Sequence, residues 1–308
     1  MTYDLAIIGG GPAGVAAGVY AARKRLKTVF ITKDFDGQSA VSLDVQNWIG
    51  SPHITGAELA KNLENHLKEY ASDIVDIKKG ELAQSVKKTP TGFSITTSKN
   101  NTYEARTILV TSGSRRRQLE APGAAEYDNK GLTYCASCDG PLFTDMDVVV
   151  VGGGNAGFDT AAQLLAYCKS VTLLARNSFR ADPDTVAKTI ANPKFKGVEN
   201  TDIIEVKGDK FVTGLIYKNR DSEKTETLEV KGIFVEIGSL PNSDFVKDTV
   251  KLEQFNHIVT DPKNQRTSQD GIWAAGDVTD GLYNQNNIAA GDAVKALEDI
   301  YLYLHKKS

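Results

Sequence analysis

The sequence lacks a long apolar run and an excess of basic residues. No stretch reaches the roughly 18 apolar residues that a membrane-spanning helix needs, and the first residues do not place an apolar segment after a charged one. Lys and Arg number 36 against 39 Asp and Glu, giving a formal net charge of -3. Such a balance disfavours nucleic acid and anionic membranes as partners. We therefore expect a cytoplasmic protein with neither partner.

Cysteine and histidine are also scarce, with three and four residues among 308. Three cysteines cannot form a disulfide framework, but the C-x-x-C spacing of Cys135 and Cys138 indicates redox or metal chemistry in a reducing compartment. Outside this pair only Cys168 and scattered histidines remain, none at zinc-ligand spacing, so we expect no metal. An inert thiol pair is the remaining alternative. Cys168 lies in an apolar run and is predicted to be a core residue. We interpret the histidines as surface or structural residues: His53, His66, His257 and His305.

A strand, a glycine-rich turn and a helix occur twice along the chain. Residues 3–8 precede 9–14 and an Ala-rich helix to about residue 24, while residues 147–151 precede 152–157 and a helix to about residue 167. In G-x-G-x-x-G turns the glycines let backbone N–H groups approach a pyrophosphate at a helix N-terminus. Two copies predict two bound dinucleotides. The usual acidic ribose anchor at the end of the next strand is missing from the first copy, and only Asp34 could serve, from slightly too far along the chain.

The remaining pattern predicts an α/β protein with two Rossmann-like, three-layer ββα domains, the second inserted in the first. Further strands are expected at 28–31, 93–97, 104–110, 171–174 and 272–275, a meander over 203–237, and a helix ending near Leu304. Thr55 and Glu58 form a capping box before Leu59, Leu63 and Leu67, which recur on one helix face. The first domain is expected to comprise 1–114 and 244–308, and the second 115–243.

The segment 135–140, Cys-Ala-Ser-Cys-Asp-Gly, resembles the redox signature of low-molecular-weight thioredoxin reductases, which are FAD-dependent pyridine nucleotide-disulfide oxidoreductases. The resemblance extends over essentially the whole chain, through residues 37–38, 45–50, 111–113, 275–278 and 283–285. Residues 133–134, 140–143 and 232–235 are also similar to the reductase part of the alkyl hydroperoxide reductase flavoprotein. Any thioredoxin-like acceptor is then expected to be a separate protein.

The resemblance implies roles for individual residues. The second cysteine, Cys138, would exchange electrons with the flavin, Cys135 would attack the partner disulfide, and Asp139 would be the general acid or base. The FAD contacts that it implies are Gly9, Gly11, Pro12, Ala13, Gly14, Gln38, Asn47, Gly113, Gly276, Asp277 and Gln285. It also implies a homodimer and thioredoxin or a thioredoxin-like protein as partner.

The electron donor is left open by the sequence. The residues expected to bind NADPH are Gly152, Gly154, Asn155, Ala156, Gly157, Arg176 and Arg180. The run 175–180 keeps two arginines of the basic segment that reads the 2′-phosphate in NADPH-using relatives. Ala175 stands where an NADH-specific relative has an acid, and Asn284 replaces an arginine that is also missing in ferredoxin-dependent relatives. NADPH is favoured, with ferredoxin and NADH as alternatives.

The leading hypothesis is therefore an enzyme that passes two electrons from a reduced donor through FAD to Cys135 and Cys138, and on to a thioredoxin-like protein. A second hypothesis reverses the reaction, with flavin and oxygen oxidising a dithiol. A third is a non-catalytic redox sensor whose cysteines signal to a partner.

Overall fold

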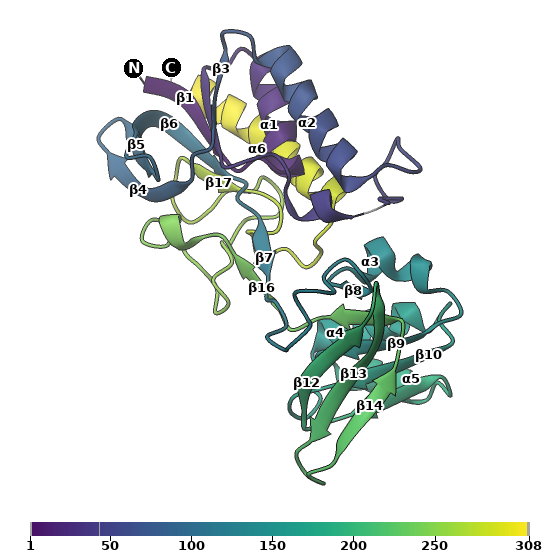
Figure 1. Ribbon diagram of the computed structural model, residues 1–308. Helices are drawn as coiled ribbons and strands as arrows, with labels where there is room; N and C mark the ends of the chain where they lie inside the picture. The colour runs from purple at the N-terminus through teal and green to yellow at the C-terminus, as the bar shows by residue number, and fades with distance from the viewer. Residues whose placement is uncertain (1, 43, 307–308) are drawn as a thin grey trace. The chain divides into compact units, whose positions relative to one another are not determined.

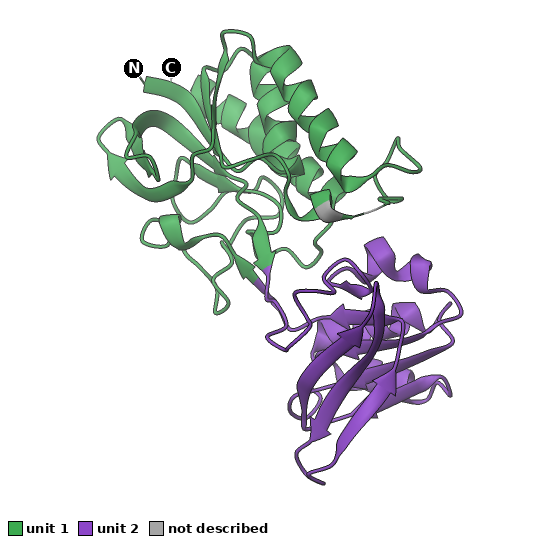
Figure 2. Ribbon diagram, viewed as in Figure 1, with its two compact units in different colours: residues 1–115, 240–308 green, residues 116–239 purple. Residues whose placement is uncertain are grey.

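The computed structural model describes residues 2–42 and 44–306, and the chain divides into two compact units (Figure 2). Unit 1 comprises residues 1–115 and 240–308, and unit 2 comprises residues 116–239. The second unit is inserted in the first, with breaks at 115/116 and 239/240 where the sequence predicts 114/115 and 243/244. Two strands carry the chain between the units and pair with each other, β7 (Ser114–Arg116) and β16 (Ser239–Pro241).

Unit 1 is built on a seven-stranded sheet in the order β3-β2-β1-β6-β5-β4, with β17 also paired to β6. The strands are β1 (Thr2–Ile8), β2 (Thr28–Thr32), β3 (Val75–Lys79), β4 (Ala83–Thr89), β5 (Gly92–Thr97), β6 (Thr102–Val110) and β17 (Ile272–Ala274). β1 pairs in parallel with β2 and β6, and β17 in parallel with β6, whereas β4 and β5 are antiparallel additions. The carboxyl ends of the parallel strands therefore meet at one edge, which is where ligands bind in such sheets.

Helices cover one face of this sheet (Figure 1): α1 (Pro12–Arg23), α2 (Gly56–Ala71) and α6 (Asn286–Lys306). Successive side chains of β1 point to opposite faces. Leu5 and Ile7 pack with these helices, while Ala6 and Ile8 pack with β4, β5 and the segment around Ile258. Both faces of the central strands are buried, as a parallel sheet requires.

Two local predictions in unit 1 are confirmed. The Thr55 hydroxyl accepts a hydrogen bond from the Glu58 N–H at 3.1 Å, and the Glu58 carboxylate accepts one from the Thr55 N–H at 3.3 Å, which completes the capping box. Leu59 and Leu67 are buried, with Leu63 half-buried beside them. Two short 3-10 helices complete the unit, η1 (Gln38–Val41) and η3 (Asp244–Val246).

Unit 2 contains a five-stranded parallel sheet in the order β11-β10-β9-β15-β8. Its strands are β8 (Leu132–Thr133), β9 (Asp147–Val151), β10 (Ser170–Leu174), β11 (Phe195–Val198) and β15 (Gly232–Val235). An antiparallel sheet consists of β12 (Thr201–Gly208), β13 (Val212–Asn219) and β14 (Thr225–Glu229). The helices are α3 (Ala136–Asp139), η2 (Gly140–Phe143), α4 (Asn155–Leu164) and α5 (Pro183–Ile190).

The central strand β9 shows that unit 2 has three layers. Val148 and Val150 pack in the cluster that contains Phe158 of α4, and Val149 and Val151 pack in the cluster that contains Leu215 of β13. The parallel sheet therefore lies between helices and the antiparallel sheet. This arrangement confirms the predicted three-layer ββα class.

Two elements of unit 2 differ from the sequence prediction. Residues 232–235 belong to the parallel sheet beside β9 and not to the meander, because all four are buried and a continuously buried run suits a parallel strand. α4 ends at Leu164 and not near Tyr167, because the next residues form a turn with i→i−3 bonds, from the Ala166 N–H to the Gln163 carbonyl at 3.2 Å and from the Tyr167 N–H to the Leu164 carbonyl at 3.1 Å. Cys168 is therefore a core residue that follows the helix.

Candidate functional site

The first glycine turn joins β1 to α1 and contains glycines with different constraints. Gly9 has a φ of 122°, and a Cβ placed there would lie 2.2 Å from the Thr111 carbonyl oxygen. A Cβ at Gly14 would lie 1.9 Å from the Gly9 oxygen, whereas one at Gly11 would have nothing within 4 Å. Gly9 and Gly14 therefore shape the turn, and Gly11 leaves its outer surface open to a close-lying ligand.

A pocket of about 1250 Å³ in unit 1 begins at this turn. Of the predicted FAD contacts it is lined by Gly9, Gly11, Pro12, Ala13, Gln38, Gly113, Gly276 and Asp277. The Gln38 amide donates to Asp277 Oδ2 and to Ser114 Oγ, both at 3.2 Å. Gly14 does not line the pocket and packs against Gly9.

Asp34 also lines this pocket, although the sequence placed it slightly far along the chain. Its carbonyl accepts a hydrogen bond from the Thr32 hydroxyl. A Cβ at Gly10 would lie 2.3 Å from the Asp34 oxygen. The middle glycine, to which the sequence analysis gave no role, thus allows the Asp34 turn to lie against the loop.

Asn47 and Gln285 contact each other from distant parts of unit 1. The Asn47 side-chain amide donates to Gln285 Oε1 at 3.1 Å, and Asn287 donates to the Asn47 carbonyl at 2.7 Å. These bonds tie the segment after η1 to the start of α6. The pair stands outside the residues that line the pocket, so a flavin-side role for the two residues stays a prediction.

The redox pair lies where β8 leads into α3 in unit 2. Cys135 and Cys138 are joined by a disulfide, and both residues are half-buried. Asp139, the last residue of α3, accepts a hydrogen bond from the Thr133 hydroxyl. The same Thr133 oxygen accepts from the Cys135 N–H at 3.3 Å. The sequence did not reveal this role of Thr133, a hydroxyl residue two positions before the first cysteine.

The second glycine turn, between β9 and α4, repeats the geometry of the first. Gly152 has a φ of 137°, and a Cβ at Gly157 would lie 2.0 Å from the Gly152 oxygen. A Cβ at Gly154 would meet nothing within 4 Å. Asn155 and Ala156 open α4 and are exposed, and Asn155 Oδ1 accepts from the Asp182 N–H at 2.9 Å. This turn therefore retains an open cradle at the N-terminus of a helix of ten residues.

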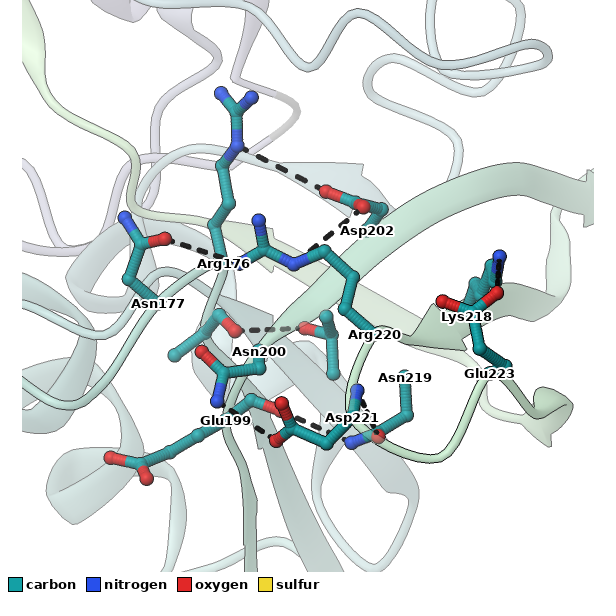
Figure 3. Close-up of polar contacts among 12 residues, drawn as sticks. Arg176, Asn177, Glu199, Asn200, Asp202, Lys218, Asn219, Arg220, Asp221 and Glu223 are labelled. Carbon is teal, nitrogen blue, oxygen red and sulfur yellow. Dashed lines mark hydrogen bonds and ion pairs between the residues drawn. The ribbon is translucent and has the colours of Figure 1, made fainter.

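The turn after β10 holds the two predicted arginines. The Arg180 N–H bonds the Gly153 carbonyl at 2.8 Å, and its side chain is exposed. Arg176 Nε lies 4.0 Å from Asp202 Oδ1, and Asp202 Oδ2 lies 3.7 Å from Arg220 Nε (Figure 3). Asp202 and Arg220 could not be identified from the sequence, because they belong to the antiparallel sheet region and are distant from the glycine turn along the chain.

Glu236 is a buried carboxylate directly after β15 in unit 2. It accepts a hydrogen bond from the Thr160 hydroxyl at 3.0 Å and lies 3.8 Å from Arg116 Nη1. Burial raises the pKa of this carboxyl, and the Arg116 charge opposes the rise only in part. Its backbone carbonyl contacts Gly152, so Glu236 lies beside the second glycine turn.

The other candidate groups are structural. Cys168 is buried, its thiol donates to the Phe143 carbonyl, and burial raises its pKa to about 11. His53 and His257 have local partners that the sequence did not reveal, Asp44 at 3.0 Å and Glu253 at 2.8 Å. Residues 2–42 and 44–306 contain no cluster of three or more His, Cys, Asp or Glu side chains able to hold a metal ion. Within the same ranges, no helix is both long and apolar enough to cross a bilayer.

Comparison with known proteins finds one family and several relatives that match nearly the whole chain. Residues 3–293 match the pyridine nucleotide-disulphide oxidoreductase family. The chain is 37% identical to the Pseudomonas aeruginosa alkyl hydroperoxide reductase F subunit, over 99% of this chain and 59% of that protein. It is 34% identical to an NADH dehydrogenase of Bacillus subtilis, over 98% and 58%. The chain thus spans about three-fifths of the length of these curated relatives.

Solved structures of similar length also match. A thioredoxin reductase from Streptococcus pyogenes is 32% identical with a TM-score of 0.90, and one from Giardia duodenalis is 32% identical with a TM-score of 0.92. Each match covers 99% of both chains. The likeness therefore includes both glycine turns and the segment with the two cysteines.

Proposed function

Because the chain belongs to the pyridine nucleotide-disulphide oxidoreductase family, we propose that it is a flavin-dependent disulfide reductase resembling thioredoxin reductase. It passes two electrons from NADPH to the disulfide of Cys135 and Cys138, and on to thioredoxin or a thioredoxin-like protein. The observation that carries the proposal is this half-buried disulfide, directly followed by a carboxylate that a neighbouring hydroxyl orients.

The pocket of unit 1 fits FAD. The open surface at Gly11 and the N-terminus of α1 suit a pyrophosphate, and Asp34, two residues past the end of β2, lines the same pocket and could anchor the ribose. Gln38 and Asp277, which line the same pocket, would hold the cofactor, and Asn47 and Gln285 would contact it on the flavin side. When bound, FAD would supply the two-electron chemistry that opens a disulfide.

The reduced cysteine pair then exchanges with the partner. The Cys135 thiolate attacks one sulfur of the partner disulfide, forms a mixed disulfide and releases the second partner sulfur as a thiolate. The Cys138 thiolate next attacks Cys135, which restores the Cys135–Cys138 disulfide and releases the first partner sulfur. The partner gains two electrons and two protons. Asp139, held by Thr133 beside the pair, is the group that delivers a proton to a departing sulfur.

The second glycine turn supports a nicotinamide nucleotide as donor. Gly152 and Gly157 are packed as tightly as their counterparts in the first turn, and Gly154 leaves the same open surface. A chain that takes electrons only from a ferredoxin would have no use for this cradle. The turn does not by itself distinguish NADPH from NADH, because both carry the same pyrophosphate.

An anaerobic titration tests the proposal. The purified flavoprotein is mixed in turn with NADPH, NADH and reduced ferredoxin while loss of flavin absorbance is followed. NADPH is expected to bleach the flavin, and the reduced protein to reduce a thioredoxin in catalytic amounts. Bleaching by ferredoxin alone would support the alternative of a ferredoxin-dependent enzyme. Failure of all three donors with rapid oxidation of dithiols in air would support a dithiol oxidase.

The Cys138→Ser variant isolates the disulfide step. It is expected to accept donor electrons on its flavin and to lose reduction of protein disulfides. Full disulfide reductase activity in this variant would contradict the roles given to the cysteines. If the wild-type protein gave only stoichiometric exchange with a partner and no turnover, the chain would be a redox sensor and not an enzyme.

The Gly154→Ala variant isolates the donor step. A methyl group there meets nothing in the protein, so the variant should fold, yet it would block close approach of a pyrophosphate. We expect slow flavin reduction by NADPH and normal reduction by dithionite. Gly291→Ala is the control, because this exposed glycine of α6 also has nothing within 4 Å. The homodimer implied by the family is checked by analytical ultracentrifugation of the same preparations.

A further inference from the structure

The turn after β10 lies directly against the second glycine turn. A Cβ at Gly153 would be 2.6 Å from the Ala175 Cβ, and the Arg180 N–H bonds the Gly153 carbonyl at 2.8 Å. In dinucleotide-binding folds the 2′ position of the adenosine ribose lies at the end of this second strand. Side chains that converge on this turn therefore decide between a 2′-hydroxyl and a 2′-phosphate.

Two arginines from different elements converge here (Figure 3). Arg176 follows β10, whereas Arg220 lies in the turn between β13 and β14. Arg220 Nη2 donates to Asn177 Oδ1 at 3.1 Å, which fixes its guanidinium to the turn after β10. Both guanidinium groups face Asp202, with Nε atoms 4.0 Å and 3.7 Å from its carboxylate oxygens.

The Asp202 carboxylate lies near both guanidinium groups but is too far from their Nε atoms to accept hydrogen bonds from them. Both distances exceed hydrogen-bond length, and Arg220 Nε is buried and makes no hydrogen bond to any of the described residues. One carboxylate between two guanidinium groups leaves a net positive charge. The Arg176 side chain is 82% exposed, so it is accessible to a ligand. A phosphate, whose oxygens match the guanidinium fork and which carries nearly two negative charges, would satisfy this pair better than Asp202 does.

An NADH-specific site would need an acidic side chain at this turn to accept a hydrogen bond from the ribose 2′-hydroxyl. Ala175, at the position where an acid would accept from the ribose, has no polar side chain and is buried. Glu199 also lies near this turn, but its Oε1 accepts a hydrogen bond from the Phe179 N–H at 2.6 Å. The exposed residues of the turn itself are Arg176, Asn177, Ser178 and Arg180, and none of them is acidic.

We propose that Arg220 is a specificity-determining residue, which together with Arg176 binds the 2′-phosphate of NADPH, and that Asp202 is the counter-ion that holds the two guanidinium groups before the phosphate arrives. This inference rests on the proposed function only in taking the second glycine turn as a nicotinamide nucleotide site. It adds a recognition residue from the β13–β14 turn, 46 positions beyond the end of β10, where recognition is normally sought.

The test uses adenosine 2′,5′-bisphosphate and 5′-AMP as probes, with binding to the purified flavoprotein measured by calorimetry at low salt. Wild-type protein is expected to bind the bisphosphate at least about tenfold more tightly than 5′-AMP. Arg220→Gln should lose about tenfold in affinity for the bisphosphate and keep its affinity for 5′-AMP, which also shows that the variant is folded. Asp202→Asn should bind the bisphosphate more tightly, because a competing anion is removed.

Lys218→Gln is the matched control. Lys218 is a cation on the same hairpin and lies opposite Asp202 in the register of β12 and β13, but its ammonium forms an ion pair with Glu223 (Figure 3). This variant should bind both probes as the wild type does. Equal losses in Arg220→Gln and Lys218→Gln would overturn the inference, because general charge and not a specific contact would then be responsible.

The outcomes also separate this inference from the proposed function. If NADPH bleaches the flavin of Arg220→Gln with an unchanged half-saturating concentration, the inference fails while the reductase proposal stands. If wild-type protein prefers 5′-AMP and NADH, the inference fails and the donor is NADH. If neither probe binds and only ferredoxin reduces the flavin, the nicotinamide site and the inference fail together.

Discussion

The hydroxyl of Thr133 donates a hydrogen bond to Asp139 and accepts one from the backbone N–H of Cys135, at 3.3 Å. One oxygen atom thus connects the proposed acid-base residue to the proposed attacking cysteine. The bond fixes one carboxylate oxygen of Asp139, and it also fixes the start of the turn that contains the disulfide. Thr133 is therefore a positioning residue for the thiol chemistry.

Replacing Thr133 by Val should slow disulfide reduction and not flavin reduction. Loss of a hydrogen bond to a charged group is worth roughly 1.5 to 3 kcal/mol, so we expect kcat with thioredoxin to fall about tenfold or more. Reduction of the flavin by the donor, measured by stopped flow, should keep its rate. Thr133→Ser retains the hydroxyl and should restore kcat together with the pH profile. Equal rates in the Val and Ser variants would show that Asp139 does not depend on this bond.

The glycines of the first turn should separate folding from cofactor binding. Gly14→Ala places a methyl group 1.9 Å from the Gly9 oxygen, so we expect a loss of about 3 kcal/mol or more in stability. Gly11→Ala meets no protein atom, so this variant should fold and lose FAD affinity. Flavin content and circular dichroism of the two purified variants distinguish the effects. A yellow Gly11→Ala protein with wild-type FAD affinity would mean that the pyrophosphate does not lie on this loop.

Cys168 should not react with thiol reagents in the folded protein. Because burial raises its pKa to about 11, only about one thiol in a thousand is a thiolate at pH 8, and the side chain is also inaccessible. A thiol titration of the oxidised protein should therefore find none that react quickly. Reduction should expose two, and denaturation after reduction should expose three. A fast-reacting thiol in the oxidised protein would show that unit 2 opens around Cys168.

Glu236 should make stability depend on pH. Its pKa in the folded protein is raised above the ordinary value of 4.5, so the folded state holds this proton more tightly than the unfolded state does. The stabilisation that protonated Glu236 gives to the folded state is therefore full below the pKa that this residue has in the unfolded chain. It is lost as pH rises through the pKa that the residue has in the folded protein. In Glu236→Gln this loss should disappear, and urea denaturation at pH 5 and pH 8 should differ less than in the wild type.

An exposed carboxylate provides the comparison for this measurement. Glu229, on β14 of the same unit, is exposed, and Glu229→Gln should leave the wild-type pH dependence in place. If Glu229→Gln and Glu236→Gln flatten the pH dependence equally, the effect comes from net charge. A dependence that is steeper in Glu236→Gln would contradict the direction of the pKa shift.

Features encoded in contiguous residues could be predicted from the sequence. The capping box at Thr55 and both glycine turns depend on chemistry within a few positions, so their patterns are legible without a fold. The strand at 232–235 was misplaced because a short apolar run does not reveal its partner. It belongs beside β9, which precedes it by more than 80 residues.

Contacts between distant elements could not be predicted in the same way. The resemblance named both Asn47 and Gln285, yet nothing in the pattern says that the two side chains bond each other. Arg220 looks like an ordinary residue of a polar turn until the β13–β14 hairpin brings it to Asn177. Such pairings are set by strand order, which only the folded chain defines.

The insertion of unit 2 has a consequence for the order in which the chain can fold during synthesis. Trp273 and Leu297 complete the core that begins with Leu5 and Ile7, so a growing chain that has reached residue 239 lacks one wall of its N-terminal unit. Unit 2 is contiguous and all of its strands have by then been made. It can close first, and by folding it shortens the loop that β17 must cross to reach β6. A released fragment that ends at residue 245 should accordingly protect Cys168 while leaving β1 open to proteases.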